Sequence, residues 1–104
     1  MDKRRSIEAK ARIFKALGHP TRLMIVEVLA ARPRCVCEIL EFVPGTQATT
    51  SRHLDVLRNA GILRRHKEGM KMIYELALPC LLKAADCASE ALKDIRAAQM
   101  SPAR

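Results

Sequence analysis

The chain has 104 residues, 49% of them hydrophobic, and a formal net charge of +8 at pH 7. This length predicts a single domain over residues 1–104, and a monomer so small is only marginally stable. The charge favours a polyanionic partner, either nucleic acid or an anionic membrane surface. Only 3% of the residues are aromatic, which argues against a single-strand binding platform that stacks bases on rings.

No apolar run approaches the roughly 20 residues that a membrane span needs, and the basic N-terminus is not followed by an apolar signal core. We therefore expect a cytoplasmic protein without a membrane partner. Its four cysteines should be reduced there, which favours metal or redox chemistry over structural disulfides.

The first half of the chain reads as three helices. An apolar stripe predicts a helix over residues 6–17, with Gly18 in the C-terminal capping role. Pro20 suits the first turn of the next helix, which is densely apolar over residues 21–31. After a Pro break, a short helix is expected over residues 34–42.

A polar helix follows, with Thr46 as its N-cap and its end near Asn59. Leu54 and Leu57, with Ala60, form its core-facing stripe. The polar side chains expected to face outward are Gln47, Thr49, Thr50, Arg52 and His53. Residues 62–67 and 70–76 then alternate around Glu68-Gly69, a pattern typical of a β-hairpin.

The final helix is expected from Pro79 to about Met100. From Leu78, just before this helix, apolar residues recur at spacings of three and four, as in a coiled-coil seam: Leu78, Leu81, Ala85, Ala88, Leu92 and Ile95. A lone surface helix packed on its own core would show the same stripe. We favour a dimer seam because the helix is long and terminal.

Short helix, tight turn, polar helix and basic hairpin, in this order, predict a mainly α-helical winged helix-turn-helix with a β-hairpin wing. In such a fold Gln47 suits adenine and Arg52 suits guanine. The other expected contacts to bases or phosphates are Thr49, Thr50 and Ser51, with His53 at a phosphate or in a buried hydrogen bond. Along the hairpin, the expected phosphate or minor-groove contacts are Arg64, Arg65, Lys67 and Lys71. The alternative is a solvated polar helix beside a basic loop.

Several motifs together resemble the ArsR/SmtB family of bacterial metal-responsive repressors. They are residues 17–23 (Leu-Gly-His-Pro-Thr-Arg-Leu), residues 35–39 (Cys-Val-Cys-Glu-Ile), residues 51–54 (Ser-Arg-His-Leu) with Leu57-Arg58, then Gly61, and Gly69 with Tyr74. The likeness covers about residues 10 to 95. It implies a winged-helix homodimer, joined through the first and last helices, that binds palindromic double-stranded operator DNA and leaves when its effector binds.

Cys35 and Cys37 are the strongest candidates for sensing. Thiolates are soft donors and suit As(III), Cd(II), Pb(II) and also Zn(II). Residues two apart in a regular helix lie about 200° apart around its axis, so these two can share an ion only where the helix start is irregular or unwinds. The alternative is that either cysteine is a small buried apolar residue.

The segment resembles the family's arsenic-sensing signature Cys-Val-Cys-Asp-Leu-Cys, but Leu40 replaces its third cysteine. As(III), or Sb(III), prefers three sulfurs, so the third donor would be Cys80 or Cys87 on the last helix. These two lie about 10 Å apart along the axis, and we favour Cys80, at the helix start. Either could instead be a packing residue. The family's zinc site between subunits is missing, because the last helix has no histidine, and this lowers Zn(II) as the effector.

The sequence therefore predicts a repressor released by As(III) or Sb(III), and not an enzyme, since no nucleophile, base and orienting group come together. One alternative is a thiol redox or persulfide sensor of the same fold, with a disulfide between Cys35 or Cys37 and Cys80 or Cys87. Another is a constitutive architectural DNA-binding protein.

Overall fold

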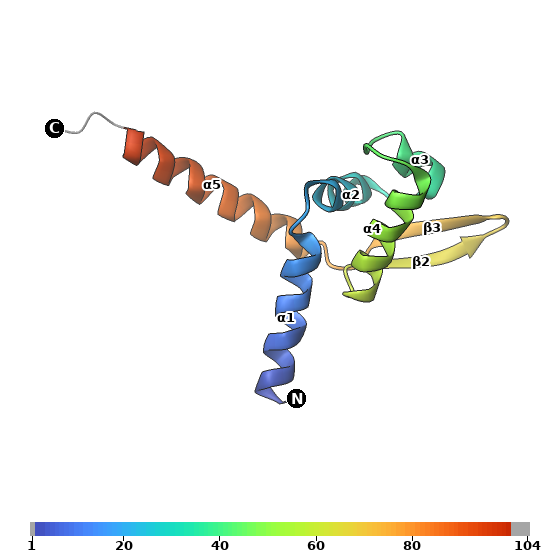
Figure 1. Cartoon of the computed structure of the whole chain (residues 1–104), viewed down its shortest axis with the longest axis horizontal. Coiled ribbons are helices and arrows are strands. Elements are labelled where there is room, and N and C mark those ends of the chain that lie inside the picture. Colours follow the sequence, from blue (N-terminus) through green and yellow to red (C-terminus); the bar gives the residue numbers. More distant parts are fainter. Residues whose placement is uncertain (1, 101–104) are drawn as a thin grey trace.

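The computed structural model describes residues 2–100, which form a winged helix-turn-helix (Figure 1). The elements in chain order are α1 (Lys3–Leu17), α2 (Pro20–Ala31), β1 (Arg34–Cys35), α3 (Val36–Leu40), α4 (Gln47–Asn59), β2 (Leu63–Glu68), β3 (Lys71–Leu76) and α5 (Cys80–Met100). Helices α2, α3 and α4 pack with the hairpin, whereas α1 and α5 project from this body in different directions.

The first two helices meet at a sharp junction. Helix α1 starts three residues earlier than predicted, where the Asp2 carboxylate accepts a hydrogen bond from the Arg4 amide at 3.4 Å. Gly18 follows α1 as expected, but its φ of −76° shows that no left-handed cap forms. The turn is instead closed by His19, whose Nδ1 accepts a hydrogen bond from the Thr21 amide at 3.1 Å, with Pro20 in the first turn of α2.

The prediction of one helix over residues 34–42 is wrong at both ends. Arg34 and Cys35 form the short strand β1, which pairs antiparallel with Tyr74 and Ile73 of β3. The helix that remains, α3, has only five residues. The strand β3 has an edge with unpaired backbone groups, and such an edge can pair with any neighbouring segment. Because β3 lies almost forty residues after β1 in the chain, the local periodicity of residues 34–42 gives no sign of this pairing.

Helix α4 and the hairpin confirm the predicted elements. Thr46 is the N-cap of α4, and its Oγ1 accepts a hydrogen bond from the Thr49 amide at 3.1 Å. Strands β2 and β3 pair from Leu63 opposite Leu76 to Glu68 opposite Lys71. The turn is therefore the two residues Gly69-Met70, one residue later than expected. Gly69 has a φ of +60°, which suits a tight hairpin turn and disfavours other residues.

The core lies between α2, α3, α4 and the base of the hairpin. Its fully buried apolar side chains are Ile25, Ile39, Leu54, Leu57, Ile62 and Val26. From α5 only the first turn joins this core, through the partly buried Leu81 and Leu82. Further along α5 the predicted seam lies in solvent within one chain, with Leu92 45% and Ile95 53% exposed. None of the helices in the described part of the chain is long and apolar enough to cross a membrane.

Candidate nucleic-acid interface and thiol site

The N-terminal half of α4 presents polar side chains at the surface. Gln47 and Arg52 are exposed and Ser51 is partly exposed. Thr49 is exposed too, but its hydroxyl is already used at the helix start, where Oγ1 accepts a hydrogen bond from the Thr46 amide at 3.0 Å. Gln47, Ser51 and Arg52 are therefore the side chains of this face whose polar groups remain available to a ligand.

Thr50 corrects one expectation about this helix. Its side chain is fully buried, not outward-facing, and its hydroxyl has no hydrogen-bond partner. Positions 50, 54 and 57 of α4 are spaced by four and three residues, so Thr50 extends the stripe of Leu54 and Leu57 by one turn. In the folded chain Thr50 is a core residue.

His53 is only partly exposed, because its ring is held by residues of the α1–α2 junction. Its Nδ1 accepts a hydrogen bond from Arg22 Nε at 3.1 Å, and its ring centroid lies 4.5 Å from that of His19. Burial lowers the pKa of His53 from its usual 6.5, and the nearby His19 and Arg22 lower it further. Of the two roles expected for His53, the geometry matches the hydrogen bond inside the fold.

The hairpin is exposed along β2 beyond Leu63. Arg64 pairs with Glu75 across the strands at 3.2 Å, and Arg65 donates to the Tyr74 hydroxyl at 3.2 Å. Within residues 2–100 no carboxylate pairs with Lys67 or Lys71, which lie on either side of the turn. The tip of the wing thus carries two ammonium groups free to meet phosphate.

The four thiols lie in different surroundings. Cys35 is only 5% exposed, whereas Cys37, Cys80 and Cys87 are exposed. Cys35 is the N-cap of α3, with the extended backbone of β1, and Cys37 lies in the first turn of the helix. Helix α5 leads away from α3 on the far side of the body (Figure 1).

A preformed metal site is not found in the described part of a single chain, where no three His, Cys, Asp or Glu side chains are grouped to hold an ion. The predicted set of Cys35, Cys37 and an α5 cysteine is therefore not brought together within one subunit. An ion held by three sulfurs would need a donor that this arrangement within one subunit does not supply.

Glu38 fastens the junction between β1 and α3. Its Oε2 accepts a hydrogen bond from Arg32 at 2.7 Å and its Oε1 one from the Cys35 amide at 3.2 Å. These contacts, with that of Arg32 first, lower the pKa of Glu38 to about 2. Because the pKa in the folded protein lies below the usual 4.5 of a free glutamate, this stabilisation is complete above pH 4.5 and is lost as the pH falls towards 2.

The role of Glu38 was not identified from the sequence, although the spacing of a capping box was visible there. In a capping box, the side chain of a Glu three residues after the N-cap accepts a hydrogen bond from the backbone amide of the N-cap residue. Cys35 and Glu38 have that spacing. Arg34 adds a second tie: its Nε donates to the Val28 carbonyl at 3.2 Å, and its guanidinium lies 4.8 Å from the centroid of the Phe42 ring. The segment that carries Cys35 is therefore held from both sides.

Comparison with known proteins places the fold. The family model described as bacterial regulatory protein, arsR family, matches residues 19–65. The helix-turn-helix transcriptional regulator MJ1325 of Methanocaldococcus jannaschii is 47% identical over 68 residues, which is 64% of this chain and 76% of that protein. The chain belongs to the ArsR family. As an ArsR-family protein it is a transcriptional regulator, and its relatives are named as regulators and not as enzymes, as the sequence predicted.

Two further similarities bear on assembly and effector. The homodimeric winged helix-turn-helix DNA-binding domain of Mb0332 from Mycobacterium bovis superposes with a TM-score of 0.75 at 27% identity, over 90% of this chain and 93% of that one. A homologue of the cadmium resistance regulatory protein CadC from Staphylococcus aureus is 40% identical over 67 residues, or 64% of this chain. The match spans about half of that relative, 55% of its length.

Proposed function

We propose that this ArsR-family regulator is a homodimeric repressor that binds operator DNA through α4 and the β2–β3 hairpin and is released when a thiophilic ion binds Cys35 and Cys37. The proposal rests above all on the exposed polar half of α4, which lies beside a wing whose Lys67 and Lys71 have no acidic partner in the described structure. Since its proposed target is operator DNA, we expect the protein to act in the cytoplasm.

DNA recognition is divided between these two elements. The side chains of Gln47 and Arg52 are free and of the types that pair with adenine and guanine in the major groove. Ser51 and Thr49 are next to them on the exposed side of α4. On the wing, Lys67 and Lys71, with Arg65 and Arg64, would meet phosphates or enter the minor groove. Each phosphate contact steepens the dependence of operator affinity on salt concentration.

Dimerisation is supported by the apolar side chains that α1 and α5 leave in solvent. Phe14 is 65% exposed and Ile7, one heptad earlier on α1, is 56% exposed. On α5, Leu92 and Ile95 continue the seam that begins at Leu81. Exposed large apolar side chains gathered on two projecting helices are typical of a protein interface. A two-fold dimer would pair the reading helices with the two halves of a palindromic site.

Effector binding is proposed at the β1–α3 junction. Cys37 is accessible, but Cys35 is buried, so an ion that binds both thiolates requires the segment held by Glu38 and Arg34 to open. Helix α3 packs against α4, and an ion that binds the opened form more tightly would thereby favour the DNA-free state. Three soft donors suit As(III) or Sb(III), and the third would be Cys80 or Cys87 of a second subunit. Cd(II), Pb(II) and Zn(II) are the other ions to test, since one relative is named for cadmium resistance.

The test is fluorescence anisotropy of the reduced protein on a duplex from its own promoter, titrated in parallel with arsenite, antimonite, Cd(II), Zn(II) and peroxide. We expect release at near-stoichiometric arsenite or antimonite. Cys35→Ser and Cys37→Ser should bind the duplex normally and no longer release it, and whichever of Cys80→Ser and Cys87→Ser behaves in the same way identifies the third donor. The Arg52→Gln variant should lose affinity for the duplex in the absence of any ion.

Other outcomes would change the assignment. Release by Cd(II) alone would replace arsenic with cadmium as the effector. Release by peroxide without metal, reversed by dithiothreitol, would make the protein a thiol redox sensor. Binding of any duplex with equal affinity, unaffected by every ion, would contradict the proposed repressor and indicate an architectural DNA-binding protein.

A further inference from the structure

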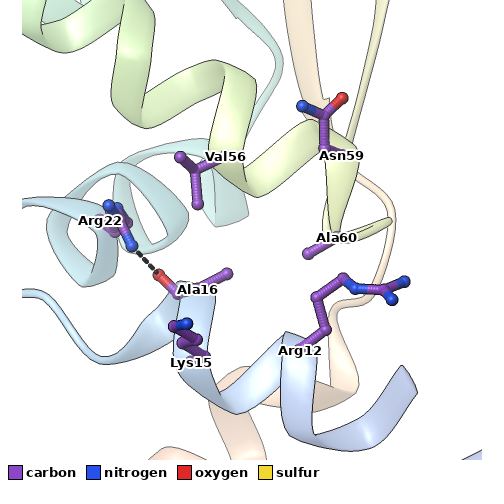
Figure 2. Close-up of a pocket in the computed structure, with 7 residues that line it drawn as sticks. All are labelled: Arg12, Lys15, Ala16, Arg22, Val56, Asn59 and Ala60. Atoms are coloured by element: carbon purple, nitrogen blue, oxygen red, sulfur yellow. Dashed lines mark hydrogen bonds between the residues drawn. The ribbon is translucent and has the colours of Figure 1, made fainter. Parts of the chain in front are cut away.

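A cavity of about 360 Å³ lies between α1, α2 and the C-terminal end of α4 (Figure 2). Its lining residues are Arg12, Lys15, Ala16, Arg22, Val56, Asn59 and Ala60. In Figure 2 the apolar side chains of Ala16, Val56 and Ala60 face one another across the space, with Lys15 and Arg22 on one side and Arg12 on the other. None of these residues belongs to the DNA-reading face or to the thiol site described above.

The charges around this cavity are of one sign. Arg12, Lys15 and Arg22 all line it, and no acidic residue does. Among residues 2–100, none of the three cations forms an ion pair with a carboxylate. Three unpaired cations around an apolar floor provide a charged rim for an anion and a surface for a small hydrocarbon group.

Arg22 is held in position before any ligand arrives. Its Nη1 donates to the Ala16 carbonyl at 3.3 Å and its Nε donates to His53 Nδ1 at 3.1 Å. A guanidinium carries about five N–H donors, so these bonds leave others free for a ligand. Because the Arg22 side chain is already ordered, binding an anion costs less side-chain conformational entropy than binding to a free arginine would.

The cavity is separate from both macromolecular surfaces. Arg12 and Ala16 are each two residues from Phe14, so they lie about 200° around α1 from the exposed apolar face. Asn59 ends α4, and at about 1.5 Å per residue it lies roughly 18 Å along the axis from Gln47 at the reading end. An operator phosphate is therefore a poorer candidate for this space than a small molecule.

We propose that this cavity binds a small monocarboxylate with a compact apolar body, such as an aromatic acid. The carboxylate meets Lys15 and Arg22 on one side of the cavity, the apolar body packs on Ala16, Val56 and Ala60, and Arg12 adds positive charge from the opposite side. The volume lies at the lower end of the ~300–1,000 Å³ usual for small-molecule sites, which favours a single ring or a branched short chain.

The probe is benzoate, compared with benzamide, which has nearly the same shape and no charge. Both are titrated into the isotopically labelled full chain, without DNA, while the amide resonances of Ala16, Val56 and Ala60 are followed. We expect saturable shifts with benzoate and none with benzamide. The Arg12→Gln/Lys15→Gln double variant should bind benzoate about tenfold more weakly, which equals about 1.4 kcal/mol, because two of the three cations that line the cavity are removed.

The matched control is Lys3→Gln/Lys10→Gln, which removes the same charge from α1 outside the cavity and should bind benzoate like the original chain. Equal shifts with benzoate and benzamide, or no shifts with either, would overturn the proposal. So would a loss of operator affinity in Arg12→Gln/Lys15→Gln without any benzoate shifts in the original chain, because the three cations would then serve DNA. Since benzoate binding is measured without DNA or metal, its failure is distinct from failure of the proposed repressor function.

Discussion

Thr50 and His53, both on α4, lie near the side chains proposed to read DNA, but each is engaged inside the fold. Thr50 is fully buried with an unpaired hydroxyl, and His53 accepts a hydrogen bond from Arg22. A polar residue type in a recognition helix therefore does not by itself identify a base contact. We therefore expect Thr50 and His53 to affect the stability of the fold, each in a different way.

Thr50→Val should stabilise the protein by about 1 kcal/mol, because a buried hydroxyl without a partner costs free energy that a methyl group does not. Operator affinity should be unchanged. Urea denaturation at fixed protein concentration measures the first effect and anisotropy the second. Thr46→Val provides the contrast, since losing the N-cap of α4 should cost about 1 kcal/mol. A Thr50→Val protein that folds normally and loses operator affinity would restore Thr50 as a DNA contact.

His53 should make stability depend on pH. Its folded-state pKa is lowered from 6.5, so the unfolded chain takes up the proton first as the pH falls. The free energy of unfolding should therefore decrease below about pH 6.5 and level off once the folded form is also protonated. His53→Gln, which keeps an acceptor for Arg22, should flatten this dependence. His66→Gln on the exposed hairpin is the control and should leave it unchanged.

At the scale of elements, the β1–α3 junction determines which thiol is accessible. Cys35 is buried, and its backbone is fixed by the pairing of β1 with β3 and by Glu38, which accepts hydrogen bonds from the Cys35 amide and from Arg32. A helix as short as α3 has few internal hydrogen bonds. Its start is therefore fixed by the hydrogen bonds of Glu38 and by the pairing of β1 with β3.

Glu38→Ala should open this junction. In the native protein we expect three thiols to react quickly with a disulfide reagent such as dithionitrobenzoate and one, Cys35, slowly. The variant should speed the slow phase about fivefold, in line with the loss of a helix cap. Glu41→Ala, just past α3, is the matched control and should leave the slow phase as it is. Four equally fast thiols in the native protein would contradict the burial of Cys35.

At the scale of the whole molecule, α1 and α5 leave apolar side chains exposed, and the proposed dimer would cover them. A groove of about 350 Å³ between them is lined by apolar side chains, including Phe14, Leu23 and Leu81. The extents of the chain, 64 × 39 × 22 Å, reflect two helices that extend beyond the core.

Leu92→Glu should weaken the dimer at least tenfold, since burying a leucine contributes about 1.5–3 kcal/mol and 1.4 kcal/mol equals a factor of ten. Sedimentation velocity over a range of concentrations would measure this. Lys93→Glu, one residue further and on another face of α5, should leave the association unchanged. A monomeric native protein at the highest concentrations tested would contradict the proposed dimer.

Much of the fold followed from local sequence patterns. The apolar stripes of α1, α4 and α5, the Thr46 cap and the alternation of the hairpin all involve contacts between residues within a few positions of each other. Their periods and turn residues are therefore legible in the chain itself. The family motifs predicted the winged helix in the same way. The burial of Thr50 was missed because a single threonine fits an outward face as well as a core.

The sequence by itself determined the four longer helices and the hairpin, the main apolar stripe of each, and that the chain carries positive charge and thiols. Only the tertiary structure decided that Arg34 and Cys35 form a strand, that Cys35 is buried while Cys37 is exposed, and that Arg12, Lys15 and Arg22 surround one cavity. Each of these depends on partners distant in sequence or on other elements: β3 for the strand, the sheet for the thiol, and α4 for the cavity. Such partners meet only when the faces of several elements are packed together, and this information is absent from any local period of residues.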